Sequence, residues 1–281
     1  MSSPAVPSPS AGISGRALSI LVALAVALGA AFVIAPRTLA GGGFADEHDL
    51  REGFRVAFVE YWSSGAEEFS PGLERAVDYW FRYHVAKAVI AALLLGVLVA
   101  LGVLLWKAFL RAGGVGVGRS AALASAGVLV TMLALFSLVI VMANIQGAVA
   151  PFSSLLPMLT SSAAEGELLV TLDQVRQRLA DSLYAGGGTP LALEVMISDF
   201  SRYHVAMAVI AAIVAVVLIG LSVVLWKRFA RTPDGRTRRV LGSFGVVSAV
   251  LSVAVIVVAV ANTTTVADPA PALLAFFDGG W

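Results

Sequence analysis

The chain has no cysteine and carries little charge for its 281 residues. The absence of cysteine excludes disulfide bonds, thiolate metal sites and cysteine nucleophiles. Charged residues make up 13% and hydrophobic residues 59% of the sequence, whereas a soluble domain has roughly 25% and 45–50%. The net charge of +1 lacks the basic excess of a nucleic-acid binder. A soluble enzyme, a disordered chain and nucleic-acid binding are therefore excluded.

Five stretches are long and apolar enough to cross a membrane. A span needs about 20 mostly apolar residues, and its backbone groups must be satisfied internally, which favours helices. These stretches are residues 17–35, 85–105, 120–143, 205–225 and 240–261, and Lys87 is the one charged residue in them. We predict an all-helical polytopic protein whose first partner is the lipid bilayer.

Residues 17–35 allow two interpretations. Thr38-Leu39-Ala40 has the small-x-small pattern of a signal cleavage site. The 19 uncharged residues exceed the apolar length of about 7–15 in a cleaved signal, and Arg37 directly precedes the pattern. We expect an uncleaved anchor, with a cleaved signal as the alternative.

The connecting segments alternate in charge. Residues 36–84, 144–204 and 262–281 carry −4, −3 and −2, whereas residues 106–119 and 226–239 carry +3 and +5. Because Lys and Arg collect on the cytoplasmic side, we predict a multi-pass plasma-membrane protein. Its N-terminus is cytoplasmic, and its long acidic segments and C-terminus are extracytoplasmic.

The sequence contains an internal duplication. Shifted by 120 residues, RYHVAKAVIAALLLGVLVALGVLLWKAFLR (82–111) matches RYHVAMAVIAAIVAVVLIGLSVVLWKRFAR (202–231) at 19 of 30 positions. A shift of 118 then aligns Asn144 with Asn262. Both copies have the same predicted topology, which is the parallel-repeat arrangement.

We therefore predict four parts. Residues 1–15 are a disordered cytoplasmic tail rich in Ser, Pro and Ala. Residues 16–36 are the first span. Residues 37–159 and 160–281 are two parallel tandem repeats, each with a helical extracytoplasmic segment and two spans.

Each copy predicts one long helix that extends beyond the membrane. Ser70 and Thr189 can cap its N-terminus, with proline at the first helical position. If unbroken, the first helix runs from Pro71 to Arg111, about 60 Å at about 1.5 Å per residue. The alternative is a kink near Tyr83.

The acidic segments also show helical spacing of apolar residues. We expect their apolar stripes to pack on the long helices, with packing on a partner as the alternative. The stripes are Leu50, Phe54, Phe58 and Tyr61 before Gly65, and Leu168, Leu172, Val175, Leu179 and Leu183 before Gly186, Gly187 and Gly188.

The repeated Arg-Tyr-His tripeptide is the sharpest candidate site. It lies at the predicted extracytoplasmic interface, where aromatic and basic residues are typical anchors. Alternatively, the two histidines meet as a metal, anion or proton-sensing site, although they supply at most half of a zinc ligand set. The residues are Arg82, Tyr83 and His84 in one copy and Arg202, Tyr203 and His204 in the other.

Lys87 extends this candidate site toward the span. It either reaches back to the membrane surface or pairs with Tyr83 or His84. At the cytoplasmic ends we predict four interfacial anchors, which are Trp106, Lys107, Trp226 and Lys227.

An acidic cluster follows the first glycine run. It comprises Asp46, Glu47, Asp49 and Glu52, with His48 among them. Acids in a first helical turn stabilise the helix dipole, and a weak divalent-cation site is the alternative.

Motifs for chemistry are missing. The sequence has no HExxH, no GxSxG and no glycine-rich nucleotide motif. We therefore predict no enzyme, no catalytic residue, no metal and no cofactor. The favoured function is a non-enzymatic scaffold, assembly factor or accessory subunit that presents its extracytoplasmic helices to a membrane or envelope protein. The alternative is a small channel or passive transporter with its path between the repeats.

The Ala, Val, Leu and Gly richness, together with the RYHVAxAVIAA and LWKxFxR strings, resembles uncharacterised polytopic integral membrane proteins of high-GC actinobacteria. The resemblance covers about a quarter of the chain. It implies a bacterial plasma-membrane location and assigns no activity or site.

Overall fold

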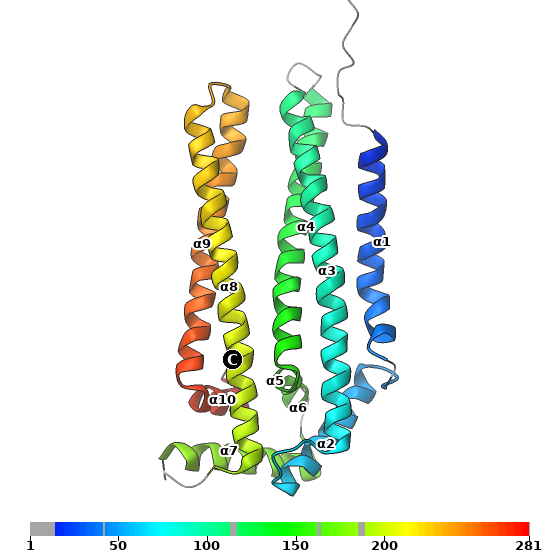
Figure 1. The fold of residues 1–281 in the computed structure, drawn as a ribbon, viewed down its shortest axis with the longest axis vertical. Coiled ribbons are helices and arrows are strands. Elements are labelled where there is room, and N and C mark those ends of the chain that lie inside the picture. Colours follow the sequence, from blue (N-terminus) through cyan, green and yellow to red (C-terminus); the bar gives the residue numbers. More distant parts are fainter. Residues whose placement is uncertain (1–14, 42, 113–116, 162–163, 185–188, 281) are drawn as a thin grey trace, which may run out of the picture. The chain divides into compact units, whose positions relative to one another are not determined.

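The computed structural model describes residues 15–41, 43–112, 117–161, 164–184 and 189–280. Within these ranges the chain is helical and contains no β-strand. Five of the described helices are long and apolar enough to cross a membrane (Figure 1). They are α1 (Gly15–Leu39), α3 (Pro71–Arg111), α4 (Val117–Val149), α8 (Leu191–Arg231) and α9 (Gly235–Ala267). This confirms the helical class and fits a multi-pass membrane protein.

Five shorter helices lie between or after the long ones in the described part of the chain. They are α2 (Glu47–Ser64), α5 (Pro151–Leu155), α6 (Pro157–Thr160), α7 (Gly166–Tyr184) and α10 (Pro269–Phe277). The two longest, α2 and α7, coincide with the predicted amphipathic segments. Gly65 ends α2 in the left-handed conformation, as its position predicts. Gly186, Gly187 and Gly188 lie outside the described residues.

The chain divides into two compact units. The first comprises residues 1–33 and 90–139. In it, Leu98, Leu101 and Leu105 of α3 are buried together with Val130 of α4, and Leu18 of α1 packs against this cluster. These contacts are apolar throughout, as expected for helices that meet in a bilayer.

The second unit comprises residues 34–89 and 140–281. Its helices α8 and α9 run antiparallel beside each other (Figure 1). We call its remaining part the helical cap: α2, α5, α6, α7 and α10, with residues 71–84 of α3 and 191–204 of α8. The predicted tandem repeats, by contrast, are defined by sequence, and their arrangement about an axis stays a prediction.

The helical cap has its own apolar core. All residues of the two predicted stripes except Leu183 are buried in it, against residues of α3 and α8, so the first of the two packing interpretations is confirmed. The largest fully buried side chains are Tyr61, Phe54, Phe58 and Phe152. Phe152 of α5 contacts the rings of Phe54, Phe58 and Tyr61 of α2, with centroids 6.2–6.5 Å apart. The cap is therefore a packed helical assembly.

The long helices match in length across the duplication. Both α3 and α8 have 41 residues, and both α4 and α9 have 33. Their bounds are displaced by the same 120 and 118 residues as the sequence matches. Helix α3 is continuous through Tyr83, as expected for the unbroken helix from Pro71 to Arg111.

The two long helices begin differently. The Ser70 hydroxyl accepts a hydrogen bond from the Leu73 N–H at 3.4 Å, as predicted for a cap. The prediction for Thr189 was wrong, because Pro190 is the N-cap of α8 and no side chain caps that end. The Pro190 carbonyl accepts from the N–H groups of Leu193 and Glu194 instead.

Candidate functional site: an acidic groove on the helical cap

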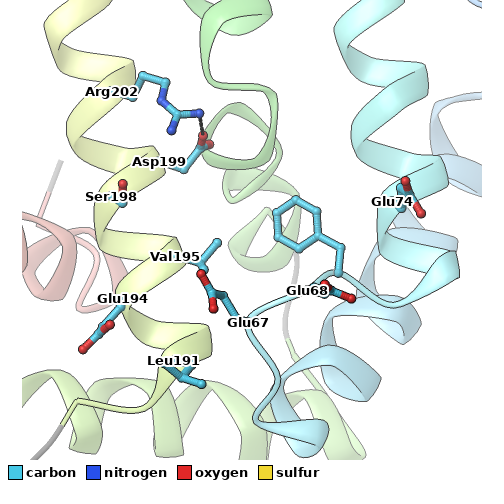
Figure 2. Close-up of a pocket in the computed structure, with 10 residues that line it drawn as sticks. Glu67, Glu68, Glu74, Leu191, Glu194, Val195, Ser198, Asp199 and Arg202 are labelled. Atoms are coloured by element: carbon cyan, nitrogen blue, oxygen red, sulfur yellow. Dashed lines mark hydrogen bonds and ion pairs between the residues drawn. The ribbon is translucent and has the colours of Figure 1, made fainter.

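A groove of about 870 Å³ lies on the helical cap between the α2–α3 connection and the start of α8 (Figure 2). Its walls come from both copies of the duplicated sequence, since α3 and α8 are the matching helices. It is lined by Glu67, Glu68, Phe69, Glu74, Leu191, Glu194, Val195, Ser198, Asp199 and Arg202. Of the residues singled out from sequence, Arg202 belongs to it.

One wall of the groove is a single stripe of α8. Leu191, Val195, Ser198 and Arg202 follow one another at intervals of four, three and four residues, which places them on one helix face. Leu191 is 50% exposed, although it is a large aliphatic side chain. The N-terminal end of this wall, at Leu191, is therefore apolar and open to solvent.

The opposite wall is the connection between α2 and α3. Phe69 fixes it, because its ring packs on Tyr61 and Phe152 with centroids 5.4 and 5.1 Å away. The Glu67 carbonyl also accepts from the Tyr61 hydroxyl at 3.5 Å. Burial raises the pKa of Tyr61 to about 12, so this hydroxyl remains a donor at neutral pH. These contacts hold Glu67 and Glu68 at the rim.

Asp199 lies at the inner side of the groove and is mostly buried. Its carboxylate accepts from the Ser153 N–H at 2.8 Å and lies 3.4 Å from Arg202 Nη1. Burial raises the pKa of Asp199, while the Ser153 hydrogen bond and the Arg202 charge act in the opposite direction. This acid therefore joins α8 to α5 and engages Arg202.

The groove is strongly negative. It contains five carboxylates and a single guanidinium, which is already engaged by Asp199. Glu74 and Glu194 lie in the first turns of α3 and α8, where acids stabilise the helix dipole. Glu67 and Glu68 lie outside any helix and are exposed. The field of the groove attracts cations.

The two arginines of the repeated tripeptide lie in different surroundings. Arg82 pairs with Asp78 at 3.2 Å and lines a second cavity, beside Gly41. Arg202 pairs with Asp199 in the acidic groove. The duplication therefore places arginine at matching positions with different neighbours.

Tyr83 and Lys87 contact each other. The Lys87 ammonium lies 4.8 Å from the centre of the Tyr83 ring. The ring of Trp80 also stacks on that of Tyr83, with centroids 5.2 Å apart. Lys87 is half-buried and reaches Tyr83, one turn nearer the predicted interface, which fits both sequence interpretations, and the choice between them stays a prediction.

Each histidine contacts the helix that follows it in its own copy. His84 Nδ1 lies 3.0 Å from the Trp80 carbonyl, and its ring lies against Gly147 of α4. His204 Nδ1 lies 2.8 Å from Asn262 Oδ1 of α9. Asn262 of α9 thus forms a hydrogen bond to α8. The meeting of the two histidines at one site stays a prediction.

Residues next to Gly147 also reach the second copy. Gln146 Nε2 donates to the Tyr203 carbonyl at 3.2 Å. The end of α4 thus contacts both Arg-Tyr-His segments.

The four residues predicted as anchors divide into two kinds. Lys107 and Lys227 are exposed. Trp106 and Trp226 each pack on a glycine of the next helix, where an added Cβ would lie 3.0 and 3.1 Å from the indole ring. Gly127 and Gly245 are 118 residues apart. The alignment at a shift of 118 residues could therefore have predicted this contact.

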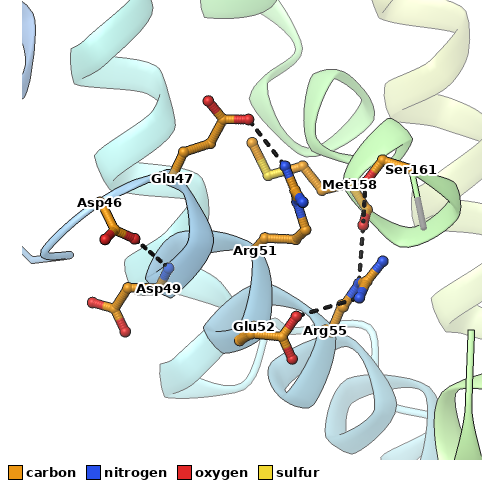
Figure 3. A network of polar contacts seen from close by, with 8 residues as sticks. All are labelled: Asp46, Glu47, Asp49, Arg51, Glu52, Arg55, Met158 and Ser161. Carbon is orange, nitrogen blue, oxygen red and sulfur yellow. Dashed lines mark hydrogen bonds and ion pairs between the residues drawn. The ribbon is translucent and has the colours of Figure 1, made fainter. Parts of the chain in front are cut away.

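The acidic cluster begins α2 (Figure 3). The Asp46 carboxylate accepts from the Asp49 N–H at 2.9 Å, and this hydrogen bond lowers the pKa of Asp46. Glu47 pairs with Arg51 at 3.1 Å. Farther along α2, Arg55 Nε donates to the Met158 carbonyl at 3.0 Å and so joins α2 to α6. These contacts fit the helix-start interpretation.

No protein-family model, curated protein sequence or solved structure matches this chain.

Proposed function

We propose that this protein is a non-enzymatic scaffold or accessory subunit of the plasma membrane, whose helical cap binds a protein partner on the extracytoplasmic side. The observation that carries the proposal is the acidic groove, an open cavity of about 870 Å³ with apolar and charged walls. Sites for partners combine such apolar contact area with a few oriented polar groups. The alternating segment charges support the placement of the cap outside the cytoplasm.

The positions of the cavities favour the cap over the spans. Four cavities have volumes of about 870, 330, 340 and 480 Å³. None of the residues that line these four belongs to a predicted span. These positions fit a binding site on the cap.

The long helices supply an anchor. Large aliphatic side chains on the spans are exposed, including Val216 at 70% and Ile213 at 60%. In water, such surfaces would cause association, whereas lipid solvates them. The spans therefore hold the cap at the membrane surface, and the cap remains available to a partner.

Site-specific photo-crosslinking in intact cells tests this proposal. A photoreactive residue replaces Val56, Leu169 or Leu191 in the cap, and the matched control replaces Val216 in a span; all four side chains are exposed. We expect a discrete protein adduct, identified by mass spectrometry, from cap positions and its absence from Val216. Adducts from Val216 alone, or none from the cap, would contradict the proposal.

A further inference from the structure

The stripe of α8 in the groove has a definite length. From Leu191 to Arg202 the helix advances eleven residues, which is about 16 Å at about 1.5 Å per residue. An extended peptide rises about 3.3 Å per residue, so about five residues span this wall. The groove thus has the length of a short extended segment.

The chemistry of the walls is mixed. Glu67 and Glu68 line one side and Glu194 the other, while Leu191 and Val195 supply apolar area along α8 (Figure 2). A lone metal ion would leave this apolar wall unused. A larger cation without apolar groups would also leave the Leu191 side chain exposed to water. The walls complement a chain that carries both positive and aliphatic side chains.

The acids at the rim are not fully explained by local structure. Helix-dipole stabilisation explains Glu74 and Glu194, which lie in first turns. It does not explain Glu67 and Glu68, which lie in the connection held by Phe69. These two carboxylates are exposed, and no basic side chain other than Arg202 lines the groove with them.

We propose that the groove binds a short extended segment of the partner in which Lys or Arg residues alternate with aliphatic ones. The basic side chains pair with Glu67, Glu68 and Glu194, and the aliphatic ones pack on Leu191 and Val195. This inference rests on the proposed function, because it names the chemistry of the partner that the cap would bind.

A peptide titration tests the inference. The full chain in a non-ionic detergent is titrated with the fluorescent peptide Lys-Leu-Arg-Leu-Lys, and binding is followed by anisotropy. The test variant is Glu67→Gln/Glu194→Gln. The matched control, Glu60→Gln/Asp181→Asn, removes the same charge from exposed cap positions outside the groove.

We expect the test variant to bind the peptide about tenfold more weakly and the control variant within about twofold of the native chain, since charged hydrogen bonds are lost only in the former. The peptide Lys-Gly-Arg-Gly-Lys should bind more weakly than the leucine peptide. Equal losses in both variants, or equal binding of both peptides, would overturn the inference. So would a groove that binds Ca²⁺ alone and ignores the peptide.

The two proposals fail in distinguishable ways. Peptide binding that is indifferent to groove variants, together with partner adducts from Val56 or Leu169, overturns the inference and leaves the proposed function. Groove-dependent peptide binding without any adduct from the cap in cells contradicts the proposed function.

Discussion

At the scale of single residues, identical side chains in the two copies have different partners. The ring of His84 lies against Gly147, whereas His204 bonds Asn262. At the shift of 118, Gly147 aligns with Thr265. The missing side chain at Gly147 makes room for the His84 ring, whereas the aligned position of the second copy carries a threonine. The tripeptide could be found from sequence, but its contacts could not, because asparagine stands at both 144 and 262 and the ring of His84 still lies against Gly147.

The close approach of His84 to Gly147 predicts a sensitive position. A Cβ at residue 147 would overlap the imidazole ring. We expect Gly147→Ala to destabilise the protein by about 1–3 kcal/mol, the usual cost of overpacking. Thermal unfolding in detergent measures it. Gly96→Ala, where nothing lies within 4 Å, is the control. Recovery of stability in His84→Ala/Gly147→Ala is expected, and equal stability of both single variants would contradict the contact.

The buried acid Asp199 predicts a pH dependence. Burial raises its pKa, so the folded state binds the proton more tightly than the unfolded state. Its contribution to stability therefore falls as the pH rises from the ordinary pKa of an aspartate through the raised one. Asp199→Asn keeps an acceptor for the Ser153 N–H and should flatten this dependence. Thermal unfolding measured between about pH 4 and pH 8 checks it.

A second variant at this position separates charge from hydrogen bonding. Asp199→Ala leaves the buried Ser153 N–H without its acceptor, and we expect a loss of about 1–3 kcal/mol. A profile for Asp199→Asn as steep as that of the native chain would assign the pH dependence to another group.

At the scale of elements, periodicity predicted the helices that have long apolar stripes. Leu50, Phe54 and Phe58 predicted α2, and an apolar run without proline predicted α3 from Pro71. The short helices α5 and α10 escaped prediction because they are too brief to show a period. They form where Pro151 and Pro269 begin a turn and where apolar residues can be buried in the cap.

Phe152 joins these elements and predicts how the cap loses its structure. Its side chain is 1% exposed and packs on Phe54, Phe58, Tyr61 and Phe69. We expect Phe152→Ala to cost about 3–5 kcal/mol, as for other buried rings. Hydrogen exchange should accelerate in α2 and α7. Phe136→Ala, at a side chain that is 64% exposed on α4, is the control. Unchanged exchange in α2 would contradict the central role of Phe152.

At the scale of the whole molecule, the groove could not be read from sequence, because its walls are more than a hundred residues apart. The residues of the α2–α3 connection have no spacing that relates them to α8. Arg202 was found through the duplication alone. The spans, by contrast, follow from composition, since lipid requires apolar helices of one minimum length.

Two valines with the same exposure predict where charge is tolerated. Val216 in a span and Val56 in the cap are both 70% exposed. Arginine at the centre of a span costs about 2.5–3.5 kcal/mol on insertion scales, whereas arginine in water costs little. We expect Val216→Arg to reduce the amount of protein in the membrane and Val56→Arg to leave it unchanged. Immunoblots of membrane fractions measure both, and equal accumulation would argue against Val216 facing lipid.

We propose that the helical cap stands outside the cytoplasm, where a partner can reach it. Because the chain has no cysteine, single substitutions provide labelling sites without background. Four single variants are made, which are Val56→Cys, Leu191→Cys, Arg119→Cys and Arg236→Cys. Intact cells that express each variant are treated with a membrane-impermeant maleimide. We expect labelling at residues 56 and 191, and labelling at residues 119 and 236 only after the cells are opened. Labelling of 119 or 236 in intact cells, with 56 and 191 protected, would contradict it.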